Sequence, residues 1–228
     1  MNIKNYREKE LTYYTILLII IIFISTDILP IEELLKNDNT SFTNIKVINI
    51  SIVAYIIYVI SYILDSLIPS HYKNILVFIS STIPGETAFT YLLNNNDIRM
   101  SKNDLLKQYK KIYEEIQTVE NPKKFQNSSW YKIYKKYQSF PMIESSHRDY
   151  LLSRDLYIIT LIITSLYIFF SCLHIELIKR SPSCYIALIS LTIIMNISTR
   201  IKSRRFVSNV IALDINTPSS SRVTWLNK

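Results

Sequence analysis

The sequence predicts an all-α polytopic membrane protein, with four transmembrane helices and a cytoplasmic helical insert between the second and the third. Three observations support this fold class. Hydrophobic residues make up 49% of the 228 residues and are gathered in a few long stretches. The chain contains one glycine, which excludes Gly-rich nucleotide-binding loops. The lysines and arginines behind the net charge of +8 are concentrated in alternate connections between the stretches.

Each apolar stretch is long enough to cross a bilayer as a helix, because an α-helix rises about 1.5 Å per residue and lipid offers no partners to irregular backbone. Prolines border three of them: Pro30 follows the first, Pro69 follows the second and Pro182 precedes the fourth. The first stretch has a basic start but lacks a small-residue cleavage pattern, so we expect an uncleaved anchor. The predicted spans are about residues 12–29, 47–68, 156–175 and 183–199.

The distribution of positive charge predicts that both termini face the cytoplasm. Three lysines or arginines precede the first stretch, thirteen lie between the second and third, and six follow the fourth, whereas each remaining connection holds two. Lysine and arginine are enriched on the cytoplasmic side of membrane proteins. The predicted organisation is two spans in residues 1–68, a basic cytoplasmic insert in 69–155, two spans in 156–199 and a basic cytoplasmic tail in 200–228.

The insert is predicted to form a helical hairpin. Ser101 and Asp104 have the spacing of a helix N-cap and capping box, and Asn121-Pro122 ends this helix. Its apolar face consists of Leu105, Tyr109, Ile112, Ile116 and Val119. The apolar face of a second helix consists of Trp130, Ile133, Tyr134 and Tyr137. A third helix is expected to begin near Ile143 and to run directly into the third span.

Lysines on the other faces of this hairpin are a candidate surface for a partner or for anionic lipid: Lys107, Lys110, Lys111, Lys132, Lys135 and Lys136. Lysines interleaved with tyrosines are also typical of single-strand nucleic-acid binders. Glu114, Glu115 and Glu120 interrupt the first row. We therefore favour a solvated or lipid-facing surface over direct nucleic-acid binding.

Residues 74–83 are apolar enough for a re-entrant or interfacial segment but short for a fifth span. Pro84-Gly85 after them favours a type II turn.

A stripe of polar residues on the second span recurs at helical spacing: Ser51, Tyr55, Tyr58, Tyr62 and Asp65. Polar groups facing lipid are costly, so we expect this stripe to face other helices or a water-filled path. A helix-packing seam is the favoured interpretation, and a face toward a water-filled path is the alternative. Asp65 and Asp155 lie near span ends, where we expect them to reach water.

Cys172 and Cys184 flank the predicted turn between the third and fourth spans, where either a disulfide or two free thiols would fit. Nucleophile elbows, metal-binding histidine pairs and Walker motifs are missing. The sequence therefore predicts neither an enzyme nor a cofactor.

Five short strings carry a family resemblance: Pro84-Gly85-Glu86, Asn96-Asp97, the helix with Tyr109 and Tyr113, Trp130 to Tyr134, and Ser153-Arg154-Asp155-Leu156. Their order resembles the transmembrane effectors of retron systems, which are bacterial antiphage modules. The resemblance implies an inner-membrane protein restrained by a complex of reverse transcriptase and noncoding RNA. It also implies that infection releases the effector, which damages the membrane and stops growth, an abortive-infection response. In such an effector, the polar stripe on the second span would be the candidate pore-lining face of a homo-oligomer.

Two other functions remain in competition with a membrane-perturbing effector. The first is a membrane anchor or scaffold that binds a cytoplasmic partner through the basic insert. The second is a small transporter or channel, which the lack of internal repeats and of glycine-interrupted spans disfavours.

Overall fold

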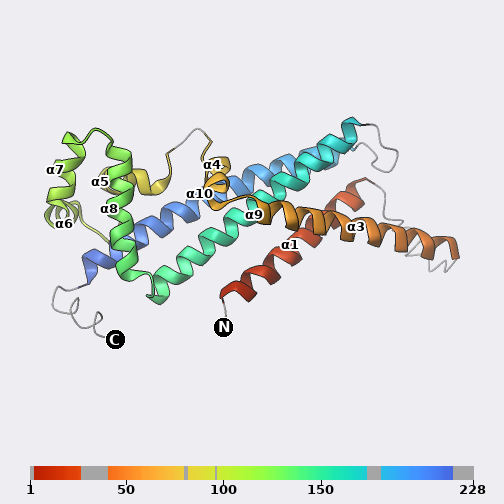
Figure 1. Cartoon of the computed structure of the whole chain (residues 1–228), viewed down its shortest axis with the longest axis horizontal. Helices are drawn as coiled ribbons and strands as arrows, with labels where there is room; N and C mark the ends of the chain where they lie inside the picture. The colour runs from red at the N-terminus through yellow and green to blue at the C-terminus, as the bar shows by residue number, and fades with distance from the viewer. Residues whose placement is uncertain (1–2, 27–40, 80–81, 96, 174–180, 218–228) are drawn as a thin grey trace. The chain divides into compact units, whose positions relative to one another are not determined.

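The computed structural model describes residues 3–26, 41–79, 82–95, 97–173 and 181–217, and in these ranges it contains helices and no β-strand (Figure 1). This confirms the all-α class. The helices are α1 (Ile3–Ser25), α3 (Ser41–Leu67), α4 (Ser70–Val77), the 3-10 helix η1 (Pro84–Thr87), α5 (Ala88–Asn94), α6 (Lys102–Gln108), α7 (Lys110–Thr118), α8 (Pro122–Tyr137), α9 (Pro141–Cys172) and α10 (Pro182–Asn216).

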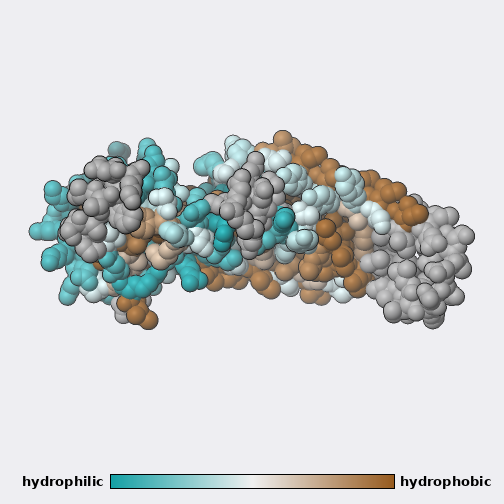
Figure 2. Space-filling model, turned by 90° about the horizontal axis from the view of Figure 1, so that it is seen from below, coloured by the Kyte–Doolittle hydropathy of each residue, from teal (hydrophilic) through white to brown (hydrophobic). Residues whose placement is uncertain are grey.

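The chain divides into two compact units. We call Met1–Val77 with Leu151–Thr199 the apolar unit, and Phe78–Tyr150 with Arg200–Lys228 the polar unit. Helices α9 and α10 contribute residues to both. On the face shown in Figure 2, hydrophobic residues cover much of the apolar unit and hydrophilic residues cover much of the polar unit.

Helices α9 and α10 are long and apolar enough to cross a membrane, and a third candidate is the pair Ser51–Leu67 and Ser70–Val77, whose axes are bent by 101°. These two or three helices fit a membrane protein. Helix α1 contains the first predicted span up to Ser25. Three parts of the predicted segments lie outside the described ranges: the rest of that span, the last residues of the third span, and residues 80–81 of the predicted re-entrant segment.

Helices α1, α9 and α10 form the core of the apolar unit, against which α3 packs Val53, Ala54, Ile57 and Tyr58. The buried core residues are Leu11, Leu18, Ile19, Ile22, Phe23, Ile159, Ile163, Tyr167, Cys184 and Leu188. The outer face of α10 exposes Ile186, Ile189, Ile193, Ile194 and Ile197, with 45% or more of each residue accessible. An apolar surface of this kind is typical of contact with lipid or with another protein.

Helix α9 begins at Pro141 and continues to Cys172, which confirms the prediction that the last helix of the insert runs directly into the third apolar stretch. Helix α10 continues to Asn216. The residues predicted as a basic tail after residue 199 are therefore helical as far as Asn216 and belong to the polar unit, and their cytoplasmic location stays a prediction. Although these residues are basic in composition, they include a buried apolar face: Phe206, Val207, Val210 and Ile211.

The predicted amphipathic faces of the insert are confirmed by burial. Leu105, Tyr109, Trp130 and Tyr137 are buried, and the other predicted members of both faces are half-buried. The Ser101 hydroxyl accepts a hydrogen bond from the Asp104 amide, as predicted for the N-cap. The first predicted helix is two helices, α6 and α7, because the backbone leaves the α region at Tyr109 (φ −113°, ψ 25°).

Gly85 lies in η1 and not in a type II turn, so that prediction is wrong. The lack of a side chain at Gly85 instead allows η1 to lie close to α8. A Cβ atom at this position would collide with the side-chain oxygen of Asn127 and lie 3.5 Å from the Trp130 ring on α8. The buried Gln126 on the same helix accepts hydrogen bonds from the Phe89 and Thr90 amides, at 3.2 and 3.1 Å, and so caps the start of α5.

Phe206 lies at the centre of an aromatic cluster in the polar unit. Its ring stacks on His147 at 4.8 Å and meets Trp130 edge to face at 5.5 Å. Tyr134 and Tyr150 also lie against it. The Trp130 indole donates a hydrogen bond to the Val207 carbonyl at 3.2 Å. Helix α10 is thereby fixed to α8 and to the start of α9.

Candidate functional site

The corner between α3 and α4 is the candidate functional site of the apolar unit. Helix α3 ends at Leu67, and Pro69 follows it, so the residue before the proline is disfavoured in the α conformation. Helix α4 then leaves at an angle of 101°. A short helix bent back in this way exposes polar backbone ends, which must find partners if the corner lies in lipid.

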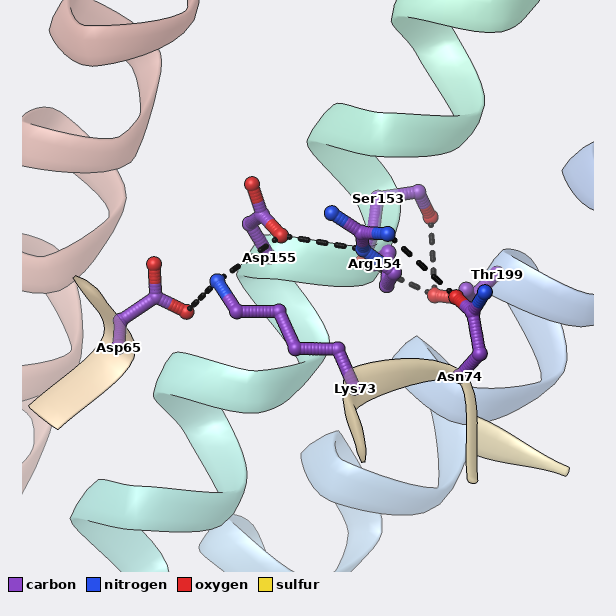
Figure 3. A network of polar contacts seen from close by, with 7 residues as sticks. All are labelled: Asp65, Lys73, Asn74, Ser153, Arg154, Asp155 and Thr199. Atoms are coloured by element: carbon purple, nitrogen blue, oxygen red, sulfur yellow. Dashed lines mark hydrogen bonds and ion pairs between the residues drawn. The ribbon is translucent and has the colours of Figure 1, made fainter. Parts of the chain in front are cut away.

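Four ionisable side chains meet at this corner (Figure 3). The Lys73 ammonium lies 2.6 Å from Asp65 Oδ1 and 3.3 Å from Asp155 Oδ1. The Arg154 Nε lies 3.2 Å from the same Asp155 oxygen. Arg154 also donates to the Asn74 side chain at 3.4 Å. We call Asp65, Lys73, Arg154 and Asp155 the corner network.

The corner network is buried. The Lys73 and Arg154 side chains are each 6% exposed, that of Asp65 is 13% exposed and that of Asp155 is fully buried. The expectation that both aspartates reach water is therefore wrong. Two carboxylates face two cations, so the formal charge cancels inside the site. A buried ion pair in this geometry tolerates removal of both partners better than removal of one.

The end of α4 is held by side chains of the long helices. The Tyr157 hydroxyl donates to the Leu76 carbonyl at 3.3 Å, and the Asn196 amide donates to the Val77 carbonyl at 3.2 Å. These donors serve carbonyls that an α-helix leaves without intrahelical partners. Together with the corner network they connect α4 to α9 and α10.

Hydroxyl groups join α9 to α10 next to the corner. The Thr199 hydroxyl donates to the Ser153 carbonyl at 2.9 Å and lies 3.2 Å from the Ser153 hydroxyl (Figure 3). Further along the same pair, Thr164 and Thr192 are 3.1 Å apart. Such bonds between hydroxyls are a usual form of adhesion between membrane helices.

Among the described helices, part of the polar stripe on α3 faces inward and part of it is exposed. Tyr58 is half-buried and bonds to Thr12 at 3.2 Å, and Asp65 joins the corner network. Ser51, Tyr55 and Tyr62 are exposed. The face that packs inward includes Ser61, which is fully buried and outside the predicted stripe. A packing seam within one chain therefore accounts for part of the stripe.

The six predicted surface lysines divide into two groups. Lys107, Lys110, Lys111, Lys132 and Lys135 are exposed on α6, α7 and α8. Lys136 is also exposed, and it differs from these five in forming an ion pair with the buried Asp214 at 3.2 Å. Cys172 is exposed and Cys184 is buried, and both are present as thiols.

Asp214 on α10 is a second buried polar centre, in the polar unit. It accepts hydrogen bonds from the hydroxyls of Tyr109 at 2.7 Å and Tyr137 at 2.8 Å, besides the Lys136 contact. Burial raises the pKa of Asp214, but the three donors outweigh it and hold the pKa below the ordinary value. Burial also raises the pKa of Tyr137, which keeps its hydroxyl a donor. Asp214 therefore joins α8 and α10 to the junction between α6 and α7 as a carboxylate.

Sequence reasoning missed both charged centres. Lys73 and Asp155 are far apart in the chain, and no spacing rule connects them. The available signal was the presence of ionisable residues beside apolar stretches, which are functional or structural contacts by default. Within the described ranges, no group of three histidine, cysteine, aspartate or glutamate side chains could hold a metal ion.

No protein-family model matches the chain, and no curated protein and no solved structure matches it either.

Proposed function

We propose that the chain is a non-enzymatic, multi-pass protein of the bacterial inner membrane that perturbs the bilayer as an effector of antiviral defence. In this proposal four helices span the membrane, both termini and the polar unit lie in the cytoplasm, and a partner complex holds the protein inactive. The observation that supports it best is the buried, charge-balanced corner network inside a unit with an apolar exterior.

The corner network supplies a physical route from a silent to a damaging arrangement. With α4 held against α9, two cations and two carboxylates neutralise one another. If α4 leaves α9, Lys73 separates from Asp155 and charged groups become exposed beside hydrocarbon. Uncompensated charge in a bilayer draws in water and thins the membrane locally. The released chain would therefore create a polar defect, and exposed Tyr55 and Tyr62 offer a polar face for assembly of several copies.

The proposed restraint is a cytoplasmic complex that favours the arrangement with α4 held. The resemblance to retron effectors suggests a reverse transcriptase with noncoding RNA as this complex. A partner can shift the equilibrium only by as much as it binds one arrangement better than the other. We expect it to bind the polar unit, whose helices α9 and α10 continue into the apolar unit.

Expression of the full chain alone in bacterial cells tests the proposal. A potential-sensitive dye should report depolarisation, and growth should stop, when the protein reaches the membrane fraction. The Asp65→Asn/Lys73→Met double variant carries fewer separable charges and should depolarise less at the same membrane level. The matched control is Lys107→Met/Lys111→Met, which alters two exposed lysines and should behave like the unmodified chain. Full potential and normal growth with abundant membrane-inserted protein would refute the effector function.

A membrane anchor or scaffold is the second candidate, and the exposed lysines of α6, α7 and α8 favour it. An anchor would capture a cytoplasmic partner without altering the membrane potential. Substitution of Lys111, Lys132 and Lys135 by glutamine in the full chain should then abolish co-purification of that partner. For an effector, the same variant would lose its restraint and become more damaging.

A further inference from the structure

We propose that a groove on the polar unit binds the phosphate headgroup of an anionic phospholipid. The groove has a volume of about 630 Å³ and is lined by residues from α5, from the turn after it and from α10. The residues that carry the inference are Tyr91, Asp97, Ile98, Arg99, Arg204 and Arg205. All belong to the polar unit.

Two of the three guanidinium groups in the groove are held in place. Arg204 lies over the Tyr91 ring, 4.8 Å from its centre. Arg99 pairs with Asp97, with 2.7 Å between Nη2 and Oδ2, and its other terminal nitrogen bonds to Asn209. Planar guanidinium groups are well suited to phosphate oxygens, which they can bind in pairs. Restricting them beforehand reduces the entropy lost on binding.

The charge in the groove is unbalanced in favour of an anion. The lining residues include one carboxylate, Asp97, and three arginines. Hydrogen bonding to Arg99 is the largest cause that lowers the pKa of Asp97, so this carboxylate stays ionised and is engaged by Arg99. Arg204 and Arg205 are exposed on α10 and supply the excess positive charge.

Exposed aliphatic side chains accompany the arginines and distinguish a lipid from a water-soluble phosphate. Ile98 is fully exposed and Ile201 is 61% exposed, and both line the groove. Contact with the acyl chains or the glycerol region of a lipid would remove these aliphatic groups from water, which is favourable. A water-soluble phosphate would leave them exposed to water.

The position of the arginines in the sequence supports the same ligand. Arg200, Arg204 and Arg205 follow directly on the apolar stretch of α10 that ends at Thr199. Basic clusters next to a membrane-spanning helix are typical binding sites for anionic headgroups. The inference rests on membrane insertion in the proposed function, but not on the effector activity.

Binding is tested on the full chain in nanodiscs of neutral phosphatidylcholine, to which phosphatidylglycerol is added in increasing fraction. Quenching of protein fluorescence by a headgroup-labelled phosphatidylglycerol reports occupancy. Arg204→Gln/Arg205→Gln should weaken the apparent affinity by about 30-fold, from two surface cations. The matched control Lys107→Gln/Lys111→Gln removes the same charge elsewhere on the polar unit and should change the affinity less than twofold. Equal loss in both variants would overturn the inference, because it would show general charge attraction.

Two further experiments distinguish a lipid headgroup from a soluble phosphate as the ligand. Glycerol 3-phosphate should compete only at concentrations far above that of the lipid. Ile98→Ser should weaken lipid binding without altering the affinity for glycerol 3-phosphate. If glycerol 3-phosphate binds as tightly as phosphatidylglycerol, the ligand is a soluble phosphate and the lipid assignment fails. If neutral phosphatidylcholine competes as well as phosphatidylglycerol, the groove does not select an anionic headgroup. Circular dichroism in neutral nanodiscs verifies that each variant is folded.

Discussion

Lys73 shares one ammonium group between two carboxylates, Asp65 on α3 and Asp155 on α9. Only 6% of the Lys73 side chain is exposed. A buried cation in this position is stabilising only while both anions remain close, since the cost of removing charge from water is large. Lys73 therefore connects α4 to both α3 and α9 through charged contacts.

Lys73→Met should lower the stability of the protein in detergent by about 3 kcal/mol, because it leaves two buried carboxylates opposite one cation. For a chain of this size the thermal midpoint should fall by roughly 6–12 °C. Asp65→Asn/Lys73→Met restores the balance between Arg154 and Asp155 and should recover at least half of that loss. Lys132→Met on the exposed face of α8 is the control and should leave the midpoint unchanged. A double variant that is no better than Lys73→Met would show that the charges are not coupled.

Asp214 predicts a pH dependence confined to the polar unit. Its pKa in the folded protein lies below the ordinary value, so its stabilising contribution is complete above pH of about 3.9 and is lost as the pH falls through the lowered pKa. Asp214→Asn should destabilise the polar unit at pH 7 on the order of 2–3 kcal/mol, because charged hydrogen bonds are lost. The difference between the two proteins should therefore stay constant above pH of about 5 and shrink as the pH falls below about 4.

Trp130 fluorescence measures this pH dependence, since its ring is buried in the polar unit. The second tryptophan is removed by Trp225→Phe in both proteins. Lys124→Gln, an exposed charge change on α8, serves as the control. A constant difference across the pH range would mean that Asp214 is not held as a carboxylate.

Individual helices were predictable where a local rule defines them. The Ser101 cap, the end of α3 before Pro69, the amphipathic faces of the insert and the continuity of α9 all follow from spacing and local chemistry. Contacts between distant elements were not predictable in this way. The corner network joins residues of three helices, α3, α4 and α9, that local patterns do not relate. The apolar face of residues 200–216 is not evident from their basic composition. Gly85 was misassigned because close packing and positive φ both favour glycine.

Phe206→Ala tests whether the last part of α10 is a core element of the polar unit. Phe206 is 5% exposed and lies within an aromatic cluster. Removing it should cost about 3–5 kcal/mol and make α6, α7 and α8 sensitive to limited proteolysis in intact membranes. Lys111→Ala, an exposed change on α7, should leave the protease pattern unaltered. Equal resistance of both variants would indicate that residues 200–216 are dispensable for the unit.

The two units place different demands on their surroundings. The apolar unit exposes isoleucines along α10 and buries its charges in the corner network. The polar unit exposes lysines and arginines and buries an aromatic cluster. A bilayer satisfies the first exterior and an aqueous compartment beside anionic lipid satisfies the second. The proposed restraint by a cytoplasmic complex requires that the polar unit lie in the cytoplasm.

Labelling from outside intact cells tests this placement most directly. In a Cys172→Ser/Cys184→Ser background, Lys111→Cys on α7 and Lys179→Cys between the third and fourth apolar stretches are compared with a membrane-impermeant maleimide. The account predicts that Lys179→Cys reacts in intact cells, whereas Lys111→Cys reacts only after the membrane is permeabilised. Reaction of Lys111→Cys in intact cells would place the polar unit outside the cytoplasm and contradict the proposed function.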